Sequence, residues 1–496
     1  KANESIGSAY SFSVAFMAHT GIGTLPILYY GNEEQHQKYI PSLATGEKLA
    51  AYCLTEPGAG SDANAGKTKC VLSEDGKHYI MNGQKMWITN GGFADVLTVF
   101  AKIDNDRVLS AFIVEADWEG VTMNPEEHKM GIRGSSTRQI FFNDVKVPVE
   151  NLLGKRGEGF RIALNILHVG RVKLGASVLG GMRVAINHSV NYANERKQFG
   201  RYISQFGAIK NKLAKQAIKQ FSTESAVYRT SGDINTLAEE NIANGMEKGP
   251  AEIDAIAKYA IEAAILKVYG SEVLDFVVDE AVQIYGGMGF SAESPVDRCY
   301  RDSRINRIFE GTNEINRMVV IDTFMKFIKR GDYDVFGMGE TLLKNNAKKY
   351  DGDGTYFGNH LATIKNMKQI AIILLTTVNN ELKRALGSEQ EIMMSISDIL
   401  IQIYITESTI LRIQKMEKAN NTNFNLYKAM GDIMVYDASQ IVRNKAFDTI
   451  NSFADGELYD TLINIIVELA KIPKMNIKEL TRQIADKMIE ENKYCF

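Results

Sequence analysis

The spacing of hydrophobic and polar residues changes near residue 48 and again near residue 150. Before the first change, apolar residues recur every three to four positions, and NEEQHQKYI predicts a helix that ends at Pro41. Short runs rich in β-branched and aromatic residues follow, such as HYIMNGQKMWITN and VLTVFAKI, and predict a β-domain that ends near Pro148. After Asn151 the helical spacing returns in long stretches, which predicts a bundle of helices.

These changes divide the chain into four predicted parts, and the fold class is mainly α with a central β-domain. The parts are an N-terminal helical domain (1–46), a β-domain (47–150), a helical bundle (151–330) and an appended helical domain (331–496). The Gly- and Asp-rich segments DYDVFGMGE and KKYDGDGTYFG introduce the last part. Because Lys1 already lies in helical sequence, we expect the first domain to be truncated and any targeting segment to be lost.

Composition excludes several classes of function. Hydrophobic residues make up 45% of the 496 residues and charged residues 24%, which is typical of globular proteins. The formal net charge of −3 gives no reason to expect nucleic acid as a partner. The 4 cysteines are scattered without a CxxC, which favours a reduced compartment, and the histidines show no metal-ligand spacing. The longest apolar runs, such as residues 370–378, are shorter than a membrane span.

The stretch RINRIFEGTNEINR (304–317) is the first candidate for chemistry. It places Glu310 between Phe309 and Gly311, with helical sequence on both sides, so we expect a break between two helices. Thr312 or Asn313 can cap the second helix. A carboxylate beside an aromatic ring is partly desolvated, which raises its pKa and suits a general base. Taken alone, however, such a motif is more often a capped surface corner with a solvated glutamate.

Two glycine-rich loops of the β-domain are candidates for binding a flat ligand. Residues 52–62 (YCLTEPGAGSD) present bare backbone N–H groups and hydroxyls, although a lone loop of this kind is more often structural. Residues 87–92 (WITNGG) combine a large ring, a hydroxyl and glycines. Together the two loops could stack on a planar heteroaromatic ring and hydrogen-bond to it.

Three further features lie in the helical bundle. The glycine cluster at residues 286–289 follows a helix rather than a strand, which excludes a Rossmann fingerprint but still allows close approach by a phosphate-bearing ligand, with Gln283 one turn earlier. Arg196 ends a helix, where a cation is favourable in any case. Arg171 lies inside an apolar helix and therefore needs a buried partner.

Over about residues 1–330 the sequence resembles the acyl-CoA dehydrogenases. The motifs CLTEPGAGSD, KMWITNGG, GIRGSST, ERKQFGR, QIYGGMGF and RDSRINRIFEGTNEI occur in the order of that family. The resemblance implies N-terminal helices, a central β-domain and a four-helix bundle, with FAD held between domains and subunits. The FAD contacts that it implies are Tyr52, Cys53, Leu54, Thr55, Gly60, Ser61, Trp87, Ile88 and Thr89 around the flavin ring, Arg196, Gln198, Phe199, Gln283, Gly286 and Gly287 from the neighbouring subunit, and Thr312 and Glu314 closing over the cofactor.

The same resemblance implies the reaction. Glu310 matches the base that removes the α-proton of a fatty acyl-CoA, while the β-hydrogen leaves as hydride to flavin N5 and a trans-2-enoyl-CoA forms, as in fatty acid β-oxidation. A backbone N–H near Glu310 and a ribityl hydroxyl of the cofactor would polarise the thioester carbonyl. Reduced FAD would pass electrons to an electron-transfer flavoprotein. Residues on the substrate side are Ser61, Arg171, Phe309 and Gly311, and no metal is expected.

Two positions distinguish this chain within the family. Some relatives carry the base as a glutamate directly before the arginine equivalent to Arg171, but Gly170 stands there, which leaves Glu310 as the candidate. Several relatives have Asp three positions before this arginine, where this chain has His168. We therefore expect the hydrogen bonds on the substrate side to differ, while the reaction stays the same.

The appended domain resembles that of the very-long-chain branch and of its relative in respiratory-complex assembly. Its apolar stripes (DILIQIYITESTILRI and YDTLINIIVELAKI) need burial, and packing on the chain's own bundle would leave a homodimer. Membrane-surface attachment is less favoured because KIPKMNIKELTRQIADKMIEENK has no strongly basic face. The rival functions are an acyl-CoA oxidase and an assembly protein of low activity. A cytoplasmic location is favoured, with the mitochondrial matrix as the alternative in a eukaryote.

Overall fold

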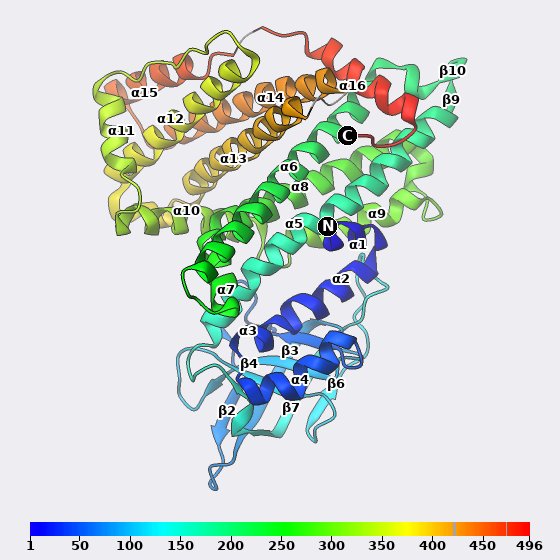
Figure 1. Cartoon of the computed structure of the whole chain (residues 1–496), viewed down its shortest axis with the longest axis vertical. Helices are drawn as coiled ribbons and strands as arrows, with labels where there is room; N and C mark the ends of the chain where they lie inside the picture. Colours follow the sequence, from blue (N-terminus) through cyan, green and yellow to red (C-terminus); the bar gives the residue numbers. More distant parts are fainter. Residues whose placement is uncertain (420–422, 473) are drawn as a thin grey trace. The chain divides into compact units, whose positions relative to one another are not determined.

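The computed structural model describes residues 1–419, 423–472 and 474–496. The chain forms two compact units, and Figure 1 shows its helices and strands. The first consists of Lys1–Gly181, Ser231–Ala263 and Arg301–Thr312, and the second of Met182–Thr230, Ala264–Tyr300 and Asn313–Phe496. Long helices of the bundle pass from one unit into the other, so the four-part division of the sequence stays a prediction.

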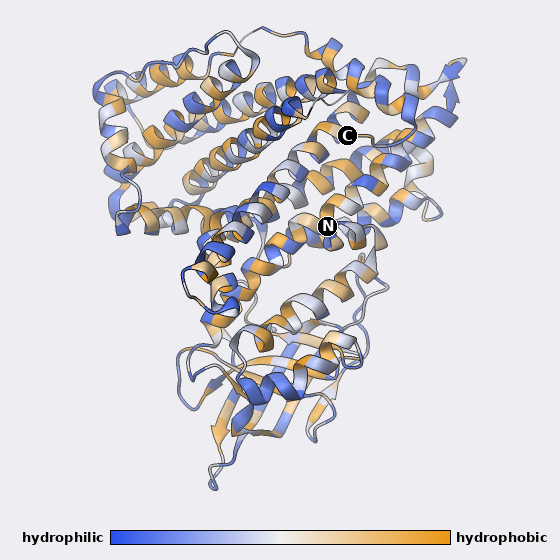
Figure 2. Ribbon diagram, viewed as in Figure 1, coloured by the Kyte–Doolittle hydropathy of each residue, from blue (hydrophilic) through white to orange (hydrophobic). Residues whose placement is uncertain are grey.

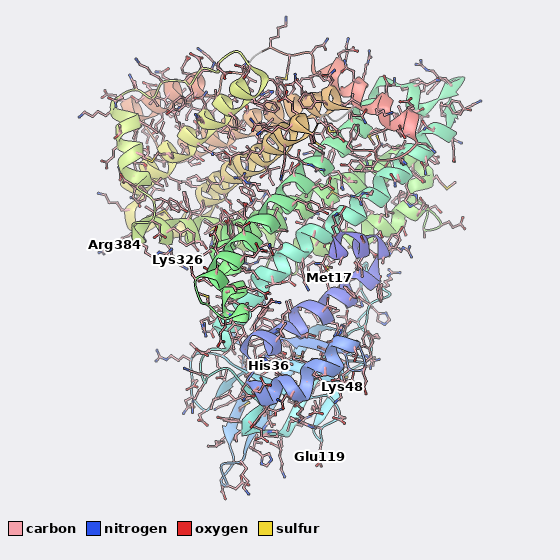
Figure 3. All side chains as sticks on the ribbon, viewed as in Figure 1. Met17, His36, Lys48, Glu119, Lys326 and Arg384 are labelled. Atoms are coloured by element: carbon pink, nitrogen blue, oxygen red, sulfur yellow. The ribbon has the colours of Figure 1, made fainter. Side chains whose placement is uncertain are left out.

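Short helices open the first unit: α1 (Ala2–Ile6), α2 (Ser11–Met17), the π-helical turn η2 (Ala18–Gly23), α3 (Leu25–Tyr30) and α4 (Glu33–Thr45). The expectation that Pro41 ends a helix is wrong, because α4 continues through it to Thr45. A capping box between Asn32 and Gln35 begins α4, and Gly46 ends it in a left-handed conformation (φ 78°). Burial of Tyr39 and Leu43 on either side of Pro41 offsets the missing backbone N–H. His36, labelled in Figure 3, joins α4 to α3 through the Ile27 carbonyl oxygen (3.1 Å).

The β-domain is one sheet in the order β6-β7-β3-β2-β4-β5-β8, and β1 pairs with β4 in parallel. Its core has two parts, one within the domain around Met81, Phe112 and Phe142, and one that joins α3, α4 and the start of α5 to β1, β4 and β5. The strands that carry the loops are therefore packed against the helices α3, α4 and the start of α5. They are β1 (Ala50–Cys53), β2 (Lys69–Leu72), β3 (His78–Thr89), β4 (Val96–Ile103), β5 (Ser110–Glu115), β6 (Val121–Met123), β7 (Thr137–Pro148) and β8 (Leu152–Leu153).

Long helices follow the sheet, as the spacing of apolar residues predicts. They are α5 (Gly159–Glu195), α6 (Gly207–Ala243), α7 (Lys248–Lys258), α8 (Ala260–Tyr285), α9 (Pro295–Ser303) and α10 (Asn313–Arg330). A two-stranded hairpin, β9 (Lys197–Gln198) and β10 (Arg201–Tyr202), separates α5 from α6, and the short helix η6 (Gly286–Phe290) follows α8. Side chains fill the spaces between the ribbons of these helices (Figure 3).

The appended segment forms six α-helices and the short helix η8 (Lys383–Ser388) in its described residues. The α-helices are α11 (Val335–Lys344), α12 (Tyr356–Leu382), α13 (Gln390–Lys418), α14 (Phe424–Asn451), α15 (Gly456–Leu469) and α16 (Ile477–Glu491). The Gly-rich DYDVFGMGE, expected only to introduce this domain, forms the start of α11, where Asp334 accepts a hydrogen bond from the Gly337 N–H at 3.0 Å.

The apolar stripes of the appended helices are buried, as predicted. Ile399, Ile405 and Ile466 are fully buried, and Figure 2 shows hydrophobic positions recurring along α13 and α14. The domain packs on α6 through the rings of Phe221 and Tyr427, whose centroids lie 5.3 Å apart, and through an ion pair between Arg412 and Glu224 (2.9 Å). Packing of the tail on its own bundle is therefore confirmed.

Three described segments are long and apolar enough to cross a membrane by length and composition alone: Ser11–Tyr30, Gly159–Glu195 and Tyr356–Ser388. The sequence analysis considered only uninterrupted apolar runs and therefore did not find these segments. A few scattered polar residues interrupt such runs, but the mean hydropathy over an 18-residue window remains high. In the third segment 72% of that window is buried inside the protein, so these apolar residues already have protein partners.

Candidate active site

Glu310 lies in the expected break between two helices. The short helix η7 (Arg304–Arg307) precedes it and α10 follows. Its φ of 58° and that of 80° at Gly311 place both residues in the left-handed region. For a residue with a side chain this conformation costs about 1–3 kcal/mol, so surrounding contacts must hold Glu310 in place.

Arg171 on α5 supplies one of these contacts. It is 3% exposed, and its Nε donates to the Glu310 carbonyl oxygen at 3.2 Å. Tyr52 on β1 lies nearby: burial raises its pKa well above the ordinary value, the negative charge of Glu310 raises it further, and Arg171 opposes this. The buried partner that the sequence required for Arg171 is thus the backbone of the candidate base.

Gly170 leaves the space that the Glu310 side chain occupies. A Cβ atom at Gly170 would lie 2.6 Å from Glu310 Oε2, 2.8 Å from Cδ and 3.0 Å from Oε1. The Glu310 carboxyl group therefore lies directly against the helix position at which some relatives carry a glutamate. The space holds one carboxylate, which can come either from position 310 or from position 170 on α5.

His168, one turn before Arg171 on α5, is the second contact of the buried arginine. Its Nδ1 lies 3.1 Å from an Arg171 terminal nitrogen. Burial lowers the pKa of His168 to about 3, and the charge of Arg171 lowers it in the same direction. The ring is therefore neutral at pH 7. Since a guanidinium can only donate, Nδ1 accepts from Arg171 and the ring proton is on Nε2.

The GIRGSST loop anchors the segment that precedes Glu310, a role that the sequence did not reveal. The Ile132 N–H donates to Asp302, and Arg301 donates to the Met130 carbonyl oxygen at 3.1 Å. Gly131 approaches so closely that an added Cβ would lie 2.2 Å from the Arg301 carbonyl oxygen. Only a glycine allows this approach, so the motif fixes the end of α9 against the β-domain.

The two glycine-rich loops of the β-domain lie side by side. The Met86 N–H donates to the Thr55 carbonyl oxygen at 2.9 Å. The pairing of β3 with β7 shifts between Lys85 and Ile88, and Trp87 in this bulge has a φ of 60° and is 52% exposed. The bulge turns the indole ring toward solvent, where it can stack on a ligand.

A buried ion pair joins β3 to the first of these loops, and no sequence motif predicted it. Lys85 Nζ contacts Glu56 Oε1 at 2.6 Å and donates to the Leu54 carbonyl oxygen at 3.2 Å. Burial alone would raise the pKa of Glu56, but the charge of Lys85 and several hydrogen bonds outweigh it and hold that pKa below the ordinary value. The alternation of polar residues along β3 could have suggested that Lys85 points inward.

The loops form a surface that fits a flat cofactor. The side chains of Cys53, Leu54 and Ile88 are buried, so these residues can offer a ligand only their backbone groups. Gly60 is exposed, and a Cβ atom there would meet nothing within 4 Å. Exposed Ser61 and the partly exposed Thr55 and Thr89 supply hydroxyls.

In the second unit, the remaining predicted residues gather at the ends of two helices. Tyr192 near the end of α5 stacks on Tyr285 at the end of α8, with centroids 4.0 Å apart. Phe199 has a φ of 52° and is 92% exposed. This group can therefore contact something outside the chain. Its predicted members, all exposed, are Arg196, Gln198, Phe199, Gln283, Gly286 and Gly287.

The start of α10, directly after the Glu310 segment, is pinned to α8. Lys267 Nζ donates to the Asn313 side-chain oxygen at 2.6 Å, and Asn313 Nδ2 donates to Glu272 at 3.0 Å. The predicted cofactor residue Glu314 is exposed, and Phe309 and Thr312 are partly exposed. The helix therefore begins at a fixed point within the second unit.

Comparison with known proteins assigns the chain to a family. It matches the acyl-CoA dehydrogenase N-terminal domain over residues 2–47, the middle domain over 51–145, and two C-terminal domains over 157–325 and 366–467. A probable acyl-CoA dehydrogenase of Bacillus subtilis is 41% identical over 99% of this chain and 83% of its own length. The human very long-chain specific acyl-CoA dehydrogenase is 45% identical over 61% of this chain, which spans 45% of that protein.

A crystal structure of an acyl-CoA dehydrogenase complexed with FAD from Bacillus anthracis has the same fold. It covers 100% of this chain and 84% of its own chain, with a TM-score of 0.96 and 42% sequence identity. The predictions of N-terminal helices, a central β-domain, a helical bundle and an appended helical domain are confirmed, as is FAD as the cofactor. The chain therefore belongs to the acyl-CoA dehydrogenase family and is an FAD-dependent oxidoreductase with an additional C-terminal helical domain.

Proposed function

We propose that the protein converts a fatty acyl-CoA to the trans-2-enoyl-CoA in fatty acid β-oxidation, with Glu310 as the base. The observation that supports this assignment best is the position of the Glu310 carboxyl group against Gly170, with Arg171 bonded to its backbone. The identity of 45% to a very long-chain specific enzyme supports a fatty acyl group as the substrate.

In this proposal Glu310 removes the α-proton of the thioester. The left-handed backbone aims the carboxylate at a fixed place, and Arg171 holds that backbone through the carbonyl oxygen. The charge of Arg171 also interacts with that of Glu310. A backbone N–H of the same segment can donate to the thioester carbonyl and stabilise the negative charge that develops there. Ser61, Phe309 and Gly311 are the proposed substrate contacts.

FAD, when bound, supplies the acceptor for the hydride that leaves the β-carbon. Two groups of residues of this chain would hold it. The Thr55 and Trp87 loops offer backbone groups, hydroxyls and an exposed indole, which suit the flavin ring. The exposed residues around Arg196 and Gly286 suit the phosphates of FAD bound to a second subunit, since the guanidinium forms strong bonds to phosphate. This assignment implies at least a homodimer.

We further propose an electron-transfer flavoprotein as the electron acceptor, because the family resemblance implies one. We propose the cytoplasm as the location, because the relatives that match nearly the whole chain are bacterial. The measurement that separates a dehydrogenase from an acyl-CoA oxidase is steady-state oxygen consumption with acyl-CoA and no other acceptor. A dehydrogenase consumes little oxygen, whereas turnover sustained by oxygen alone would assign an oxidase. Anaerobic titration with acyl-CoAs of graded length would give the preferred chain length.

The replacement Glu310→Gln tests the catalytic assignment. The amide keeps the shape of the side chain but cannot accept the α-proton, so bleaching of the flavin band by acyl-CoA should slow by at least ~10²–10⁴-fold while FAD stays bound. The control is Glu119→Gln, at an exposed carboxylate of the β-domain labelled in Figure 3, which should leave the rate unchanged. Near-normal flavin reduction in Glu310→Gln would refute Glu310 as the base.

A further inference from the structure

The appended domain contains a groove between α11 and α12, whose lining begins at Asp334. The two helices approach closely at Gly339, where an added Cβ would lie 1.9 Å from the Thr376 hydroxyl. The segment before α12 forms another wall, because the Asn366 side chain bonds to both the N–H and the carbonyl oxygen of Tyr350 (2.7 and 3.0 Å). The volume of this open groove is about 540 Å³, within the ~300–1,000 Å³ of small-molecule sites.

The groove surface is mainly apolar. Met338 and Leu342 face it from α11, Ile372 from α12, and the Tyr350 ring from the connecting segment. Met338 and Tyr350 are about half exposed (52% and 51%), so the groove is open to solvent along one side. A ligand that covered these side chains would remove their apolar surface from water, which is favourable.

Most polar groups that line the groove already bond within the protein. Asp334 caps α11, and the Thr341 hydroxyl donates to the Gly337 carbonyl oxygen at 2.9 Å. Gln369 donates to the Lys348 carbonyl oxygen at 3.3 Å, and Lys368 pairs with Glu407 at 2.5 Å.

Lys365 differs from the other polar residues of the lining. It is exposed, and its ammonium lies 5.7 Å from the centre of the Tyr350 ring. In the described part of the chain, no carboxylate lies within 4 Å of this ammonium. The lining therefore offers a ligand an apolar trough with the ammonium of Lys365 at its edge. The second lysine of the lining, Lys368, is already paired with Glu407, and the one carboxylate of the lining, Asp334, caps α11.

We propose that this groove binds a long-chain fatty carboxylate, with the alkyl chain along Met338, Leu342 and Ile372 and the carboxylate on Lys365. An alkyl chain needs no hydrogen bonds, which matches a lining whose inner polar groups are already bonded. An extended peptide fits less well, because strand addition requires unpaired backbone groups and both walls are helices. None of the lining residues is among the proposed acyl-CoA contacts, and the proposal does not depend on the catalytic assignment of Glu310.

The test is photolabelling of the full-length FAD-bound protein with a diazirine analogue of palmitate, followed by peptide mapping. We expect saturable labelling of residues 334–372 that unlabelled palmitate displaces, alongside any labelling elsewhere. Lys365→Glu should raise the half-saturating concentration about tenfold, the typical effect of losing a charge-assisted bond. Lys326→Glu makes the same charge change on an exposed residue of α10, labelled in Figure 3, and should have no effect.

A second variant, Leu342→Arg, places a charge in the trough and should abolish labelling there, with unchanged flavin reduction as evidence that the protein still folds. The proposal is overturned if labelling of this stretch does not saturate, or if Lys365→Glu behaves like Lys326→Glu. It is also overturned if a diazirine acyl-CoA labels the groove while the free acid does not.

Discussion

Replacing Gly170 by alanine should separate the position of the candidate base from its chemistry. The change adds one methyl group, and it does so 2.6 Å from Glu310 Oε2 and 2.8 Å from Cδ. Ordinary contacts of a Cβ atom lie at 3.4–4 Å, so the carboxylate must move by about 1 Å or rotate away. Gly170→Ala thus leaves Glu310 intact and displaces it.

The size of the effect follows from this displacement. A misplacement of about 1 Å in a reacting group costs on the order of 10²-fold in rate, or about 2.7 kcal/mol in the barrier. Stability should change little or increase, because alanine is more favourable than glycine inside a helix by about 1 kcal/mol. A loss of rate therefore could not be attributed to unfolding.

The assay is anaerobic stopped-flow reduction of the flavin by acyl-CoA, at matched FAD content. Gly232→Ala on α6 is the matched control, because a Cβ atom at that exposed position meets nothing within 4 Å. We expect reduction about 10²-fold slower in Gly170→Ala and unchanged in Gly232→Ala. A rate within threefold of the wild type in Gly170→Ala would show that the reacting carboxylate is not the one against this helix.

Three further outcomes are expected. Arg196→Ala should lose FAD on extensive dialysis while the remaining holoenzyme reduces normally, and full occupancy would contradict the phosphate contact. Because His168 titrates at about 3 in the fold and near 6.5 when unfolded, it destabilises the fold by ~1.4 kcal/mol for each pH unit below 6.5. Between pH 6.5 and pH 5, the free energy of unfolding should therefore fall by about 2 kcal/mol less in His168→Asn than in the wild type. The exposed control His128→Asn should fall as the wild type does, and an equal pH dependence of stability in all three proteins would refute the assignment. Light scattering should show a dimer for the full chain and larger assemblies after deletion beyond Arg330, since the deletion uncovers Phe221; a full-length tetramer would contradict this.

The sequence predicted the order of the elements well because period and composition report burial. The strands and the long helices lie in the stretches where the pattern placed them, and the break at Glu310 follows from Gly311 and the helical flanks. Pro41 was misjudged because its local cost is smaller than the gain from burying Tyr39 and Leu43 in the core around the sheet. A local rule fails where tertiary packing outweighs it.

The supporting contacts of the site could not be predicted in the same way. The Lys85–Glu56 pair joins residues 29 positions apart, and the bond from Ile132 to Asp302 spans 170 positions. The alternation along β3 could indicate that Lys85 points inward, but nothing local identifies Glu56 as its partner, since a glutamate in a loop is an ordinary surface residue. Arg171 was the exception, because an arginine in an apolar helix is locally unfavourable and so demands a partner.

Backbone strain shows most clearly where local and tertiary preferences oppose each other. Trp87, Phe199 and Glu310 all have positive φ angles, and each lies in a segment selected from the sequence for its motif. No propensity scale would place a tryptophan, a phenylalanine or a glutamate in the left-handed region, where each costs about 1–3 kcal/mol. The strain at Glu310 is held by the bond from Arg171, and that at Trp87 lies next to the bond from Met86 to Thr55. If these contacts serve to aim side chains, replacing Arg171 should lower the rate of flavin reduction more than it lowers the stability of the fold. Loss of the bond to the Glu310 carbonyl oxygen would misplace the carboxylate, but it would also relieve the backbone strain at Glu310.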